Sequence, residues 1–507
     1  MKINSQTHQF IYALSFIEGA SVMSAELLGA KMLAPFYGSS LYVWATVMAV
    51  TLGGLALGYF AGGIIAAKNK NNNMLFYVVI LAAICTALMP ISLKVVSFIC
   101  ASFSLVMAII ISTIVFLMPP VFLMGMVSPL IIEKLNNSGQ NAGKIAGSVY
   151  AISTLGGILA TFLMGFYIIP HYGLSKPALF TGILLSILPL YAVFFERMKF
   201  MFSVTLFLII GTIIFKQNHF TSDIKILYQK EGLLGQIMVV DYPIYQKNNS
   251  PDYYIRMMLF NRVIQTFDNK NDSAHRYFPY VSILVNESNY QIKNGNALLL
   301  GLGGGCVANE LQKKNFKVDA VELDERVGKA ASQFFNLHKN TKVFIDDARR
   351  YIRNCNKKYD LIVFDVFKGE ENPAHIITKE SLLEVKKLLN PMGMLAINSY
   401  GFRSGVKSSG TGAIINTLHN GGFYTNIVPS SIKEEEGNLL IFAKEERFIT
   451  ENKPFQFEAS VLSSSPILTD DKPILEILNK EAVMAWRTAY VETAIKDFNQ
   501  RNVPLFN

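Results

Sequence analysis

The chain has 507 residues, of which 51% are hydrophobic and 16% are charged, and its mean hydropathy of +0.32 excludes an ordinary soluble enzyme. Its net charge of +9 fits a domain held against anionic lipid, and the lack of dense Lys/Arg runs interleaved with aromatic residues argues against nucleic-acid binding. The four cysteines form no Cys-x-x-Cys pair and the seven histidines have no metal-ligand spacing, so we expect a reducing compartment and no metal site.

The first part of the chain is predicted to be a multi-pass α-helical membrane domain over residues 1–220. Long uncharged runs there approach the roughly 20 residues that an α-helix needs to cross a bilayer. The region from Lys94 to Ile132 allows one span plus an interfacial piece, or two tight spans. The first span is long and lacks a clear cleavage site, so we expect a retained helix rather than a signal peptide. We interpret the runs as about seven spans, near residues 9–31, 41–67, 74–92, 105–132, 145–170, 177–195 and 199–215.

Three kinds of residue stand out within the spans. Small residues that favour close helix packing recur in the second span and near the fifth, at Gly54, Gly58, Gly62, Gly143 and Gly147. Prolines that are expected to break the fourth span lie at Pro119, Pro120 and Pro129. Glu18 and Glu26 lie on the same side of the first span, where they predict either a polar ligand path or carboxylates that sit near the interfaces or pair with Lys31.

The soluble half begins near residue 221. Residues 224–268 alternate apolar and polar and predict a small antiparallel β subdomain within residues 221–290. Strands and amphipathic helices then alternate, which predicts an α/β Rossmann-like domain with a parallel, doubly wound sheet over residues 291–450. A C-terminal helical extension is expected over residues 451–507, with a first helix capped by Thr469-Asp-Asp471. The strands are expected at 297–301, 317–322, 341–345, 359–365 and 393–398.

A glycine loop predicts a nucleoside site. Ala297-Leu-Leu-Leu-Gly-Leu-Gly-Gly-Gly-Cys306 resembles a buried strand, a turn and the start of a helix, where the backbone can approach a ligand closely. Glu322 ends the next strand, about 20 residues on, and is placed to accept both hydroxyls of a ribose. Because parallel strands share one carboxyl edge, we expect Cys306, Glu322, Asp347 and Asp365 to converge.

These motifs together carry a family resemblance, over about residues 230–445. The chain resembles the spermidine synthase (polyamine aminopropyltransferase) family, and the whole is similar to bacterial members with a multi-span segment before the synthase domain. The resemblance implies a transferase in the cell (inner) membrane. We expect the soluble half in the cytoplasm because nucleoside cofactors are made there, although the positive charges flanking the spans are almost balanced. The motifs are Gly235-Gln-Ile-Met-Val-Val240, Leu299 to Cys306, Val321-Glu-Leu-Asp324, Asp347-Ala348, Asp365 and Asn372-Pro-Ala-His-Ile-Ile-Thr-Lys379.

By resemblance, the donor is decarboxylated S-adenosylmethionine and the acceptor is a polyamine or other amine, such as putrescine, with no metal. Glu322 would bind the ribose, Asp347 with Ala348 the adenine, and Gln236 with Tyr277 would line the crevice between donor and acceptor. Asp365 would accept a proton from the attacking amine. The donor loop would comprise Gly301, Gly303, Gly305 and Cys306. Membrane lipid is a further expected partner, and a homodimer is the oligomer that we consider.

Three positions depart from the family pattern. Cys306 replaces the acid that in soluble members holds the ammonium of the donor's aminopropyl group. Lys368 replaces a second acid three residues after the catalytic one, and Glu370 and Glu371 would supply the missing charge to the substrate if their loop folds back. Phe278 replaces a histidine.

Two other functions therefore stay open. One is transfer of a methyl or aminocarboxypropyl group from intact S-adenosylmethionine, because Cys306 would not repel the donor's carboxylate. The other is a transporter or sensor whose soluble domain binds nucleoside or polyamine without catalysis, which Lys368 and the carboxylates of the membrane half favour.

Overall fold

The computed structural model of the chain consists of two compact units, and each is described by itself. The first comprises Met1–Ser222, Lys230–Gln236 and Phe498–Asn507, and the second Asp223–Gln229 and Ile237–Asp497. The structure describes residues 5–37, 41–68, 73–100, 103, 105–136, 142–195, 223–232, 234–245, 250–272, 276–367, 373–431, 436–448, 457, 459–501 and 503.

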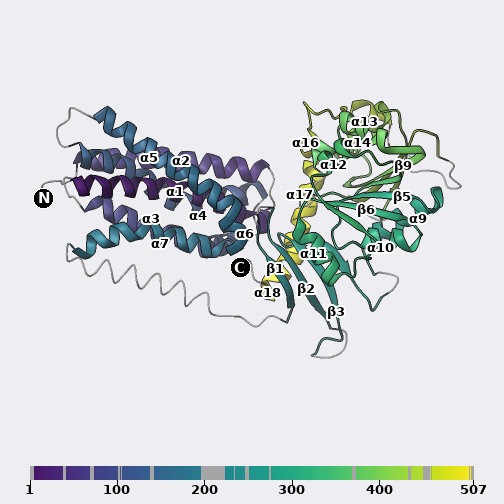
Figure 1. Cartoon of the computed structure of the whole chain (residues 1–507), viewed down its shortest axis with the longest axis horizontal. Helices are drawn as coiled ribbons and strands as arrows, with labels where there is room; N and C mark the ends of the chain where they lie inside the picture. Colours follow the sequence, from purple (N-terminus) through teal and green to yellow (C-terminus); the bar gives the residue numbers. More distant parts are fainter. Residues whose placement is uncertain are drawn as a thin grey trace. The chain divides into compact units, whose positions relative to one another are not determined.

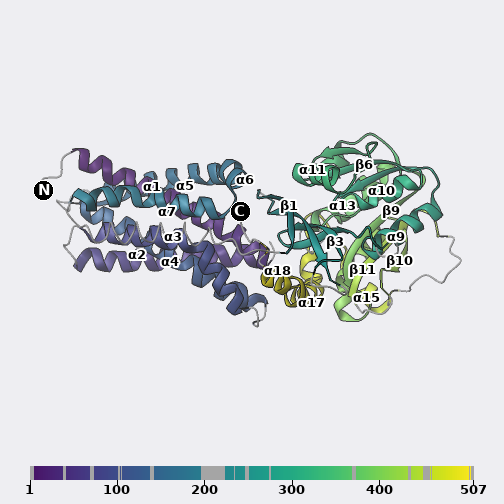
Figure 2. The same cartoon turned by 90° about the horizontal axis from the view of Figure 1, so that it is seen from below.

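The first unit contains a bundle of long helices that lie side by side in both views (Figures 1 and 2). Within the described residues, six helical segments are long and apolar enough to cross a membrane, and they match the first six predicted spans. The seventh predicted span, 199–215, lies outside the described residues. The helices are α1 (Ser5–Tyr37), α2 (Leu41–Lys68), α3 (Met74–Ile99), α4 (Leu105–Leu135), α5 (Ala142–Leu163) with the π-helical turn η2 (Met164–Ile168), α6 (Ile169–Tyr172) and α7 (Ser175–Phe195).

The predicted break in the fourth span is wrong, because α4 runs unbroken through all three of its prolines. Close packing against α2 accompanies this stretch. A Cβ at Gly58 would collide with the carbonyl of Phe122 and lie 2.9 Å from Gly125 Cα, so the two helices meet backbone to backbone. Gly62 makes a similar approach to Met126, whereas a Cβ at Gly143 or Gly147 would meet no described atom within 4 Å, so the packing prediction fails at those two positions.

Glu18 is 2% exposed inside the bundle. Its Oε2 accepts a hydrogen bond of 3.1 Å from the hydroxyl of Ser153 on α5, whereas Glu26 is half-buried. A cavity of about 440 Å³ lies elsewhere between α1, α5 and α7, with mostly apolar lining that includes Ser21 and Ser24. The polar environment of Glu18 is therefore a hydroxyl of a neighbouring helix.

The second unit begins with the antiparallel sheet that the sequence predicts. Its order is β1-β2-β3-β4, and the hairpin between the last two strands turns through Asn261 and Arg262, whose φ angles of 48° and 64° suit a tight two-residue turn. The strands are β1 (Lys225–Lys230), β2 (Ile237–Ile244), β3 (Tyr253–Phe260) and β4 (Val263–Asp268).

The main sheet has seven strands in the order β10-β11-β9-β8-β5-β6-β7. The five predicted strands are present and parallel, but β11 runs antiparallel to both of its neighbours, β9 and β10, so the prediction of an all-parallel sheet is wrong at this edge. The reason is that β11 returns beside β9 and directly pairs with β10. The strands are β5 (Asn296–Leu300), β6 (Lys317–Glu322), β7 (Lys342–Ile345), β8 (Tyr359–Phe364), β9 (Leu389–Phe402), β10 (Tyr424–Pro429) and β11 (Glu436–Lys444).

Alternate residues of the strands fill two separate cores, one on each face of the sheet. Leu298 and Phe364 pack with α12, α13 and α14, whereas Leu299 and Val363 pack with α9 and α10 (Figure 1). This is a Rossmann-like, three-layer architecture. The helices are α9 (Pro279–Gln291), α10 (Cys306–Lys313), α11 (Glu325–Phe334), α12 (Ala348–Asn354), α13 (Lys379–Leu388) and α14 (Ser409–Asn420).

The end of the chain is helical, as predicted, but Thr469-Asp-Asp471 does not cap a helix. The next helix, α16 (Leu475–Leu478), has Ile474 as its N-cap residue. Asp470 binds arginine side chains instead, as described below. The other C-terminal helices are α15 (Ala459–Ser464), α17 (Lys480–Tyr490), the π-helical turn η5 (Val491–Ile495) and α18 (Lys496–Gln500).

Candidate active site

The glycine loop lies across the ends of three neighbouring parallel strands. Gly301 N donates to Val321 O at 2.9 Å, and Asp365 N donates to Leu300 O at 2.9 Å. Gly301 has φ +87°, and a Cβ there would collide with the carbonyl oxygen of Asp365. Only glycine allows this approach, which brings the ends of β5, β6 and β8 together.

A strand of the small sheet supports the loop from outside. Gly304 N donates to the hydroxyl of Thr266 on β4 at 2.9 Å, and a Cβ at Gly304 would lie 2.6 Å from Thr266 Cγ2. Gly303 and Gly305 have φ angles of +52° and +80°, and Gly305 is the N-cap residue of α10. The predicted turn and helix start are therefore present, and Thr266 fixes the loop.

Glu322 ends β6 and points its carboxylate back at the loop. Its Oε2 accepts from Leu302 N at 3.1 Å and its Oε1 from Asp324 N at 2.9 Å. Burial raises the pKa of Glu322, and these two backbone bonds oppose the rise. Leu323 is a further backbone donor to this carboxylate, which keeps acceptor capacity for a ligand hydroxyl group.

Asp365 follows β8 and is held by two neutral donors. The phenol of Tyr280 donates to its Oδ2 at 3.1 Å, and the amide of Asn398 donates to its Oδ1 at 2.8 Å. Burial raises the pKa of Asp365, while these hydrogen bonds lower it. Burial also raises the pKa of Tyr280 well above the usual range, so its hydroxyl keeps its proton and can donate. A carboxylate in such a setting is a stronger base than one in water.

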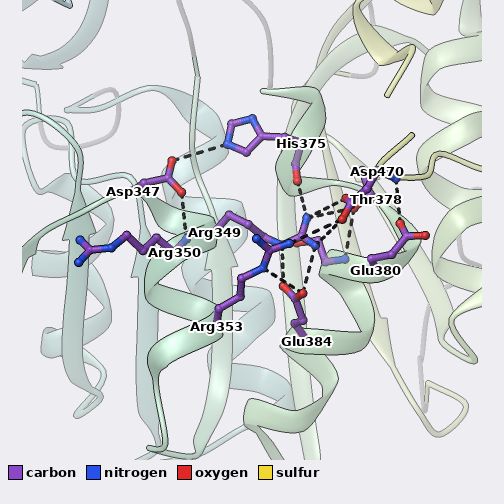
Figure 3. Close-up of polar contacts among 10 residues, drawn as sticks. Asp347, Arg349, Arg350, Arg353, His375, Thr378, Glu380, Glu384 and Asp470 are labelled. Carbon is purple, nitrogen blue, oxygen red and sulfur yellow. Dashed lines mark hydrogen bonds and ion pairs between the residues drawn. The ribbon is translucent and has the colours of Figure 1, made fainter. Parts of the chain in front are cut away.

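Asp347 and Ala348 lie at the start of α12, after β7. Asp347 is the N-cap residue, and its Oδ1 accepts from Arg350 N at 2.9 Å. Its Oδ2 lies 3.6 Å from His375 Nε2, which comes from the segment after Asp365 (Figure 3). Because Asp346 N also donates to Glu322 O, the end of β7 lies next to Glu322, the residue predicted to bind the ribose.

Arg349 lies at the centre of a group of polar contacts next to Asp347 and Ala348 (Figure 3). The Arg349 side chain is 6% exposed, and its guanidinium forms an ion pair with Glu384 on α13 and another, at 3.1 Å, with Asp470 of the C-terminal segment. It also donates to His375 O at 2.6 Å and to the Thr378 hydroxyl at 3.1 Å. One buried cation therefore joins the start of α12, the segment before α13 and the C-terminal segment.

Cys306 is 8% exposed at the first position of α10. Burial, and the negative charge of Asp268 and Asp365, raise the pKa of its thiol far above the usual range. The thiol is therefore protonated at neutral pH and is not the activated nucleophile that a helix N-terminus can produce. Tyr277 lies in the same region, with the Arg276 guanidinium carbon 5.0 Å from its ring centre.

The remaining predicted residues are not brought to this loop by any described contact. Gln236 is buried in the first unit, where its amide donates to Glu231 Oε1 at 2.7 Å. Glu370, Glu371 and Lys368 lie outside the described residues. Their predicted roles stay predictions. Among the described residues, no group of three or more His, Cys, Asp or Glu could hold a metal ion.

Several residues that complete the site were not predicted. Tyr280 follows the Tyr277 motif by three residues, and Arg349 directly follows Asp347-Ala348, so proximity to a motif was the available signal for these two. The other three lie on strands with no motif of their own: Thr266, Asp268 and Asn398.

Comparison with known proteins places this arrangement in a class. Residues 277–402 match the model of the spermine/spermidine synthase domain. The polyamine aminopropyltransferase of Vibrio vulnificus is 36% identical over 145 residues, which are 27% of this chain and 48% of that protein. The N-terminal histidine N-methyltransferase of Emericella nidulans is 37% identical over 111 residues, 21% of this chain and 20% of that protein. The chain thus spans about half the length, or less, of these curated relatives.

Among solved structures, a probable spermidine synthase from Corynebacterium glutamicum covers 51% of this chain and 93% of its own, with 17% identity and a TM-score of 0.37. The strand order and the glycine loop define a Rossmann-like domain with the methyltransferase type of fold. The matched domain and the curated relatives are more specific: residues 277–402 form a spermine/spermidine synthase domain, and this part of the chain is similar to polyamine aminopropyltransferases.

The first prediction concerns Glu322. If its carboxylate holds two ribose hydroxyls, Glu322→Ala should weaken binding of methylthioadenosine by about 2–4 kcal/mol, measured by calorimetry on the full chain in detergent. Glu325→Ala is the matched control, because Glu325 is exposed and pairs with Lys329 on the surface of α11. Unchanged affinity in the Glu322 variant would remove this residue from the nucleoside site.

The second prediction concerns the acid limb of the pH–rate profile. Activity that needs the Asp365 carboxylate is lost as pH falls through its raised pKa. Tyr280→Phe removes a donor to the charged form, which raises that pKa further, so the limb should move to higher pH. A hydrogen bond worth about 1 kcal/mol corresponds to about 0.7 pH unit. Tyr290→Phe, at an exposed site on α9, should leave the limb in place. A shift to lower pH would contradict the assignment.

Proposed function

We propose that the chain is a membrane-anchored aminopropyltransferase that moves an aminopropyl group from decarboxylated S-adenosylmethionine to a diamine such as putrescine. The observation that carries this proposal is the junction of the glycine loop, Glu322 and Asp365 at adjacent strand ends. A nucleoside donor held by the loop and Glu322 would place its sulfonium carbons toward Asp365. The match of residues 277–402 to the spermine/spermidine synthase domain and the similarity to a polyamine aminopropyltransferase support the choice of reaction.

The chemistry follows from the charge state of the amine. A primary amine is protonated at neutral pH and cannot attack, so the reaction requires a base at the acceptor nitrogen. Asp365 would accept that proton while the nitrogen forms a bond to the aminopropyl carbon and the carbon–sulfur bond breaks. The sulfur keeps the bonding electrons and methylthioadenosine leaves. Alignment of nitrogen, carbon and sulfur would supply much of the acceleration.

Tyr280 and Asn398 suit this role for Asp365. Both donors are neutral, so they fix the carboxylate without removing its basicity as a lysine or arginine would. Asn398 is held in turn, because its Oδ1 accepts from the amide of Asn438 at 2.8 Å. This chain of amides leads away from the site through β9 and β11 and would keep Asp365 in one orientation.

A second candidate reaction is transfer of a methyl or aminocarboxypropyl group from intact S-adenosylmethionine. The favouring observation is the neutral thiol of Cys306 at the position where soluble family members carry an acid. Such a thiol would not repel the carboxylate of the intact donor. The partial similarity to a histidine N-methyltransferase is consistent with this alternative.

We also propose that the helices of the first unit anchor the enzyme in the cell membrane, with the second unit in the cytoplasm. Six described segments of sufficient length and apolarity support the anchoring. The cytoplasmic assignment rests on the supply of the nucleoside donor.

The third prediction tests the base. Asp365→Asn keeps the shape but removes the proton acceptor, so turnover should fall at least about a hundredfold while methylthioadenosine still binds. Product formation from decarboxylated S-adenosylmethionine and putrescine is measured by mass spectrometry. Asp360→Asn, at the opposite end of β8, is the control and should keep turnover. Near-normal turnover in the Asp365 variant would exclude this base.

The fourth prediction tests location. The full chain should stay in the membrane fraction after alkaline carbonate washing. In cells that carry Asp252→Cys, a membrane-impermeant maleimide should modify the added cysteine only after lysis, because this exposed position lies in the second unit. The unsubstituted chain gives the background from the native cysteines. Modification in intact cells would place the second unit outside the cytoplasm.

A further inference from the structure

A cationic donor tail needs a carboxylate that the glycine loop does not supply. Decarboxylated S-adenosylmethionine has an ammonium at the end of its aminopropyl tail, and Cys306 stands where soluble family members carry the acid for it. The thiol is buried and neutral. If the proposed function is right, another residue near Cys306 must take over the charge.

Asp268 is the carboxylate best placed for this role. Thr266 and Asp268 are both buried on β4, two residues apart, so their side chains leave the strand on the same side. The Thr266 hydroxyl already accepts from Gly304 N, two residues before Cys306. Asp268 therefore points to the side of the small sheet that holds the loop, and its charge acts on the Cys306 thiol.

Arg276 forms an ion pair with Asp268 from its outer side, and Arg256 lies opposite Asp268 on β3. Arg276 Nε donates to Oδ1 at 2.7 Å and its Nη2 to Oδ2 at 3.3 Å. The side chain of Asp268 is 3% exposed and that of Arg276 is 35% exposed. A buried carboxylate needs such a counter-charge, and each of its oxygens keeps one lone pair beyond the bond to the guanidinium.

We propose that Asp268 binds the ammonium of the donor's aminopropyl tail, and that Arg276 neutralises this carboxylate when no donor is bound. This inference rests on the proposed function and names the residue that recognises the donor's tail. The guanidinium and the ammonium compete for one carboxylate. Removal of the two partners should therefore have opposite effects on donor binding.

The test is calorimetry on the full chain in detergent with two probes, decarboxylated S-adenosylmethionine and methylthioadenosine, which lacks the aminopropyl ammonium. Asp268→Asn should weaken binding of the decarboxylated donor at least about tenfold, because a charge-assisted bond is lost. Arg276→Gln should strengthen it by a few-fold, because the competing cation is gone. Methylthioadenosine affinity should change in neither variant.

A purely structural ion pair would behave differently, because either substitution would then lower the affinity for both probes. That result would overturn the inference. Asp319→Asn is the matched control: Asp319 is also a buried carboxylate paired with a more exposed cation, Lys357, and it lies on β6 away from the strand end that carries Glu322, so its loss should leave the ratio of the two affinities unchanged.

A rescue variant keeps the inference testable if Asp268→Asn is unstable. Cys306→Asp in the Asp268→Asn background places a carboxylate at the position where soluble family members carry one. This double variant should recover most of the lost affinity for the decarboxylated donor. No recovery, with methylthioadenosine still bound, would mean that the two positions do not face the same group.

Failure of this inference is distinguishable from failure of the proposed function. Wild-type chain that binds methylthioadenosine but forms no product with the decarboxylated donor would contradict the proposed reaction. If the wild-type chain forms product, but the Asp268 and Arg276 variants both bind the two probes more weakly, only the assignment of Asp268 to the donor's tail is contradicted.

Discussion

The candidate site depends on a backbone contact in which Gly301 lies against the carbonyl of Asp365. Parallel strands end at one edge of a sheet, but a loop with side chains would hold their ends apart. Here the missing Cβ and the positive φ of Gly301 let β5 turn across the end of β8 while its N–H bonds to β6. The loop, Glu322 and Asp365 share one edge because of this contact.

Two distant parts of the chain keep that edge in place. On the N-terminal side, the Thr266 hydroxyl accepts a hydrogen bond from Gly304 N and holds the glycine loop in position. On the C-terminal side, Asp470 pairs with Arg349 beside Asp347-Ala348 (Figure 3). The small sheet and the C-terminal segment therefore both support the candidate site, since each bonds directly to one of its elements.

The three buried or half-buried carboxylates of the site differ in their partners, and the partners fit different tasks. Backbone N–H groups orient Glu322 and leave lone pairs for neutral hydroxyls. A phenol and an amide hold Asp365, and burial raises its pKa, which suits proton transfer. Arg276 neutralises Asp268, and this pairing suits the proposed role of Asp268, in which the guanidinium gives way to the ammonium of the donor. Similar side chains thus acquire separate roles from their surroundings.

The sequence alone determined what depends on local pattern. Apolar run length predicted the first six spans, and hydrophobic periodicity with the glycines predicted the small sheet, β5 to β9 and the strand-end residues. Local pattern misjudged the prolines of α4, the antiparallel edge and Asp470, because helix packing, strand pairing and ion pairing involve partners elsewhere in the chain. Only the tertiary structure showed that Tyr280, Asn398 and Thr266 complete the site and that Asp470 anchors it. Tyr280 lies 85 residues from Asp365, and Asp470 lies 121 residues from Arg349, so chain topology rather than residue spacing brings these side chains together.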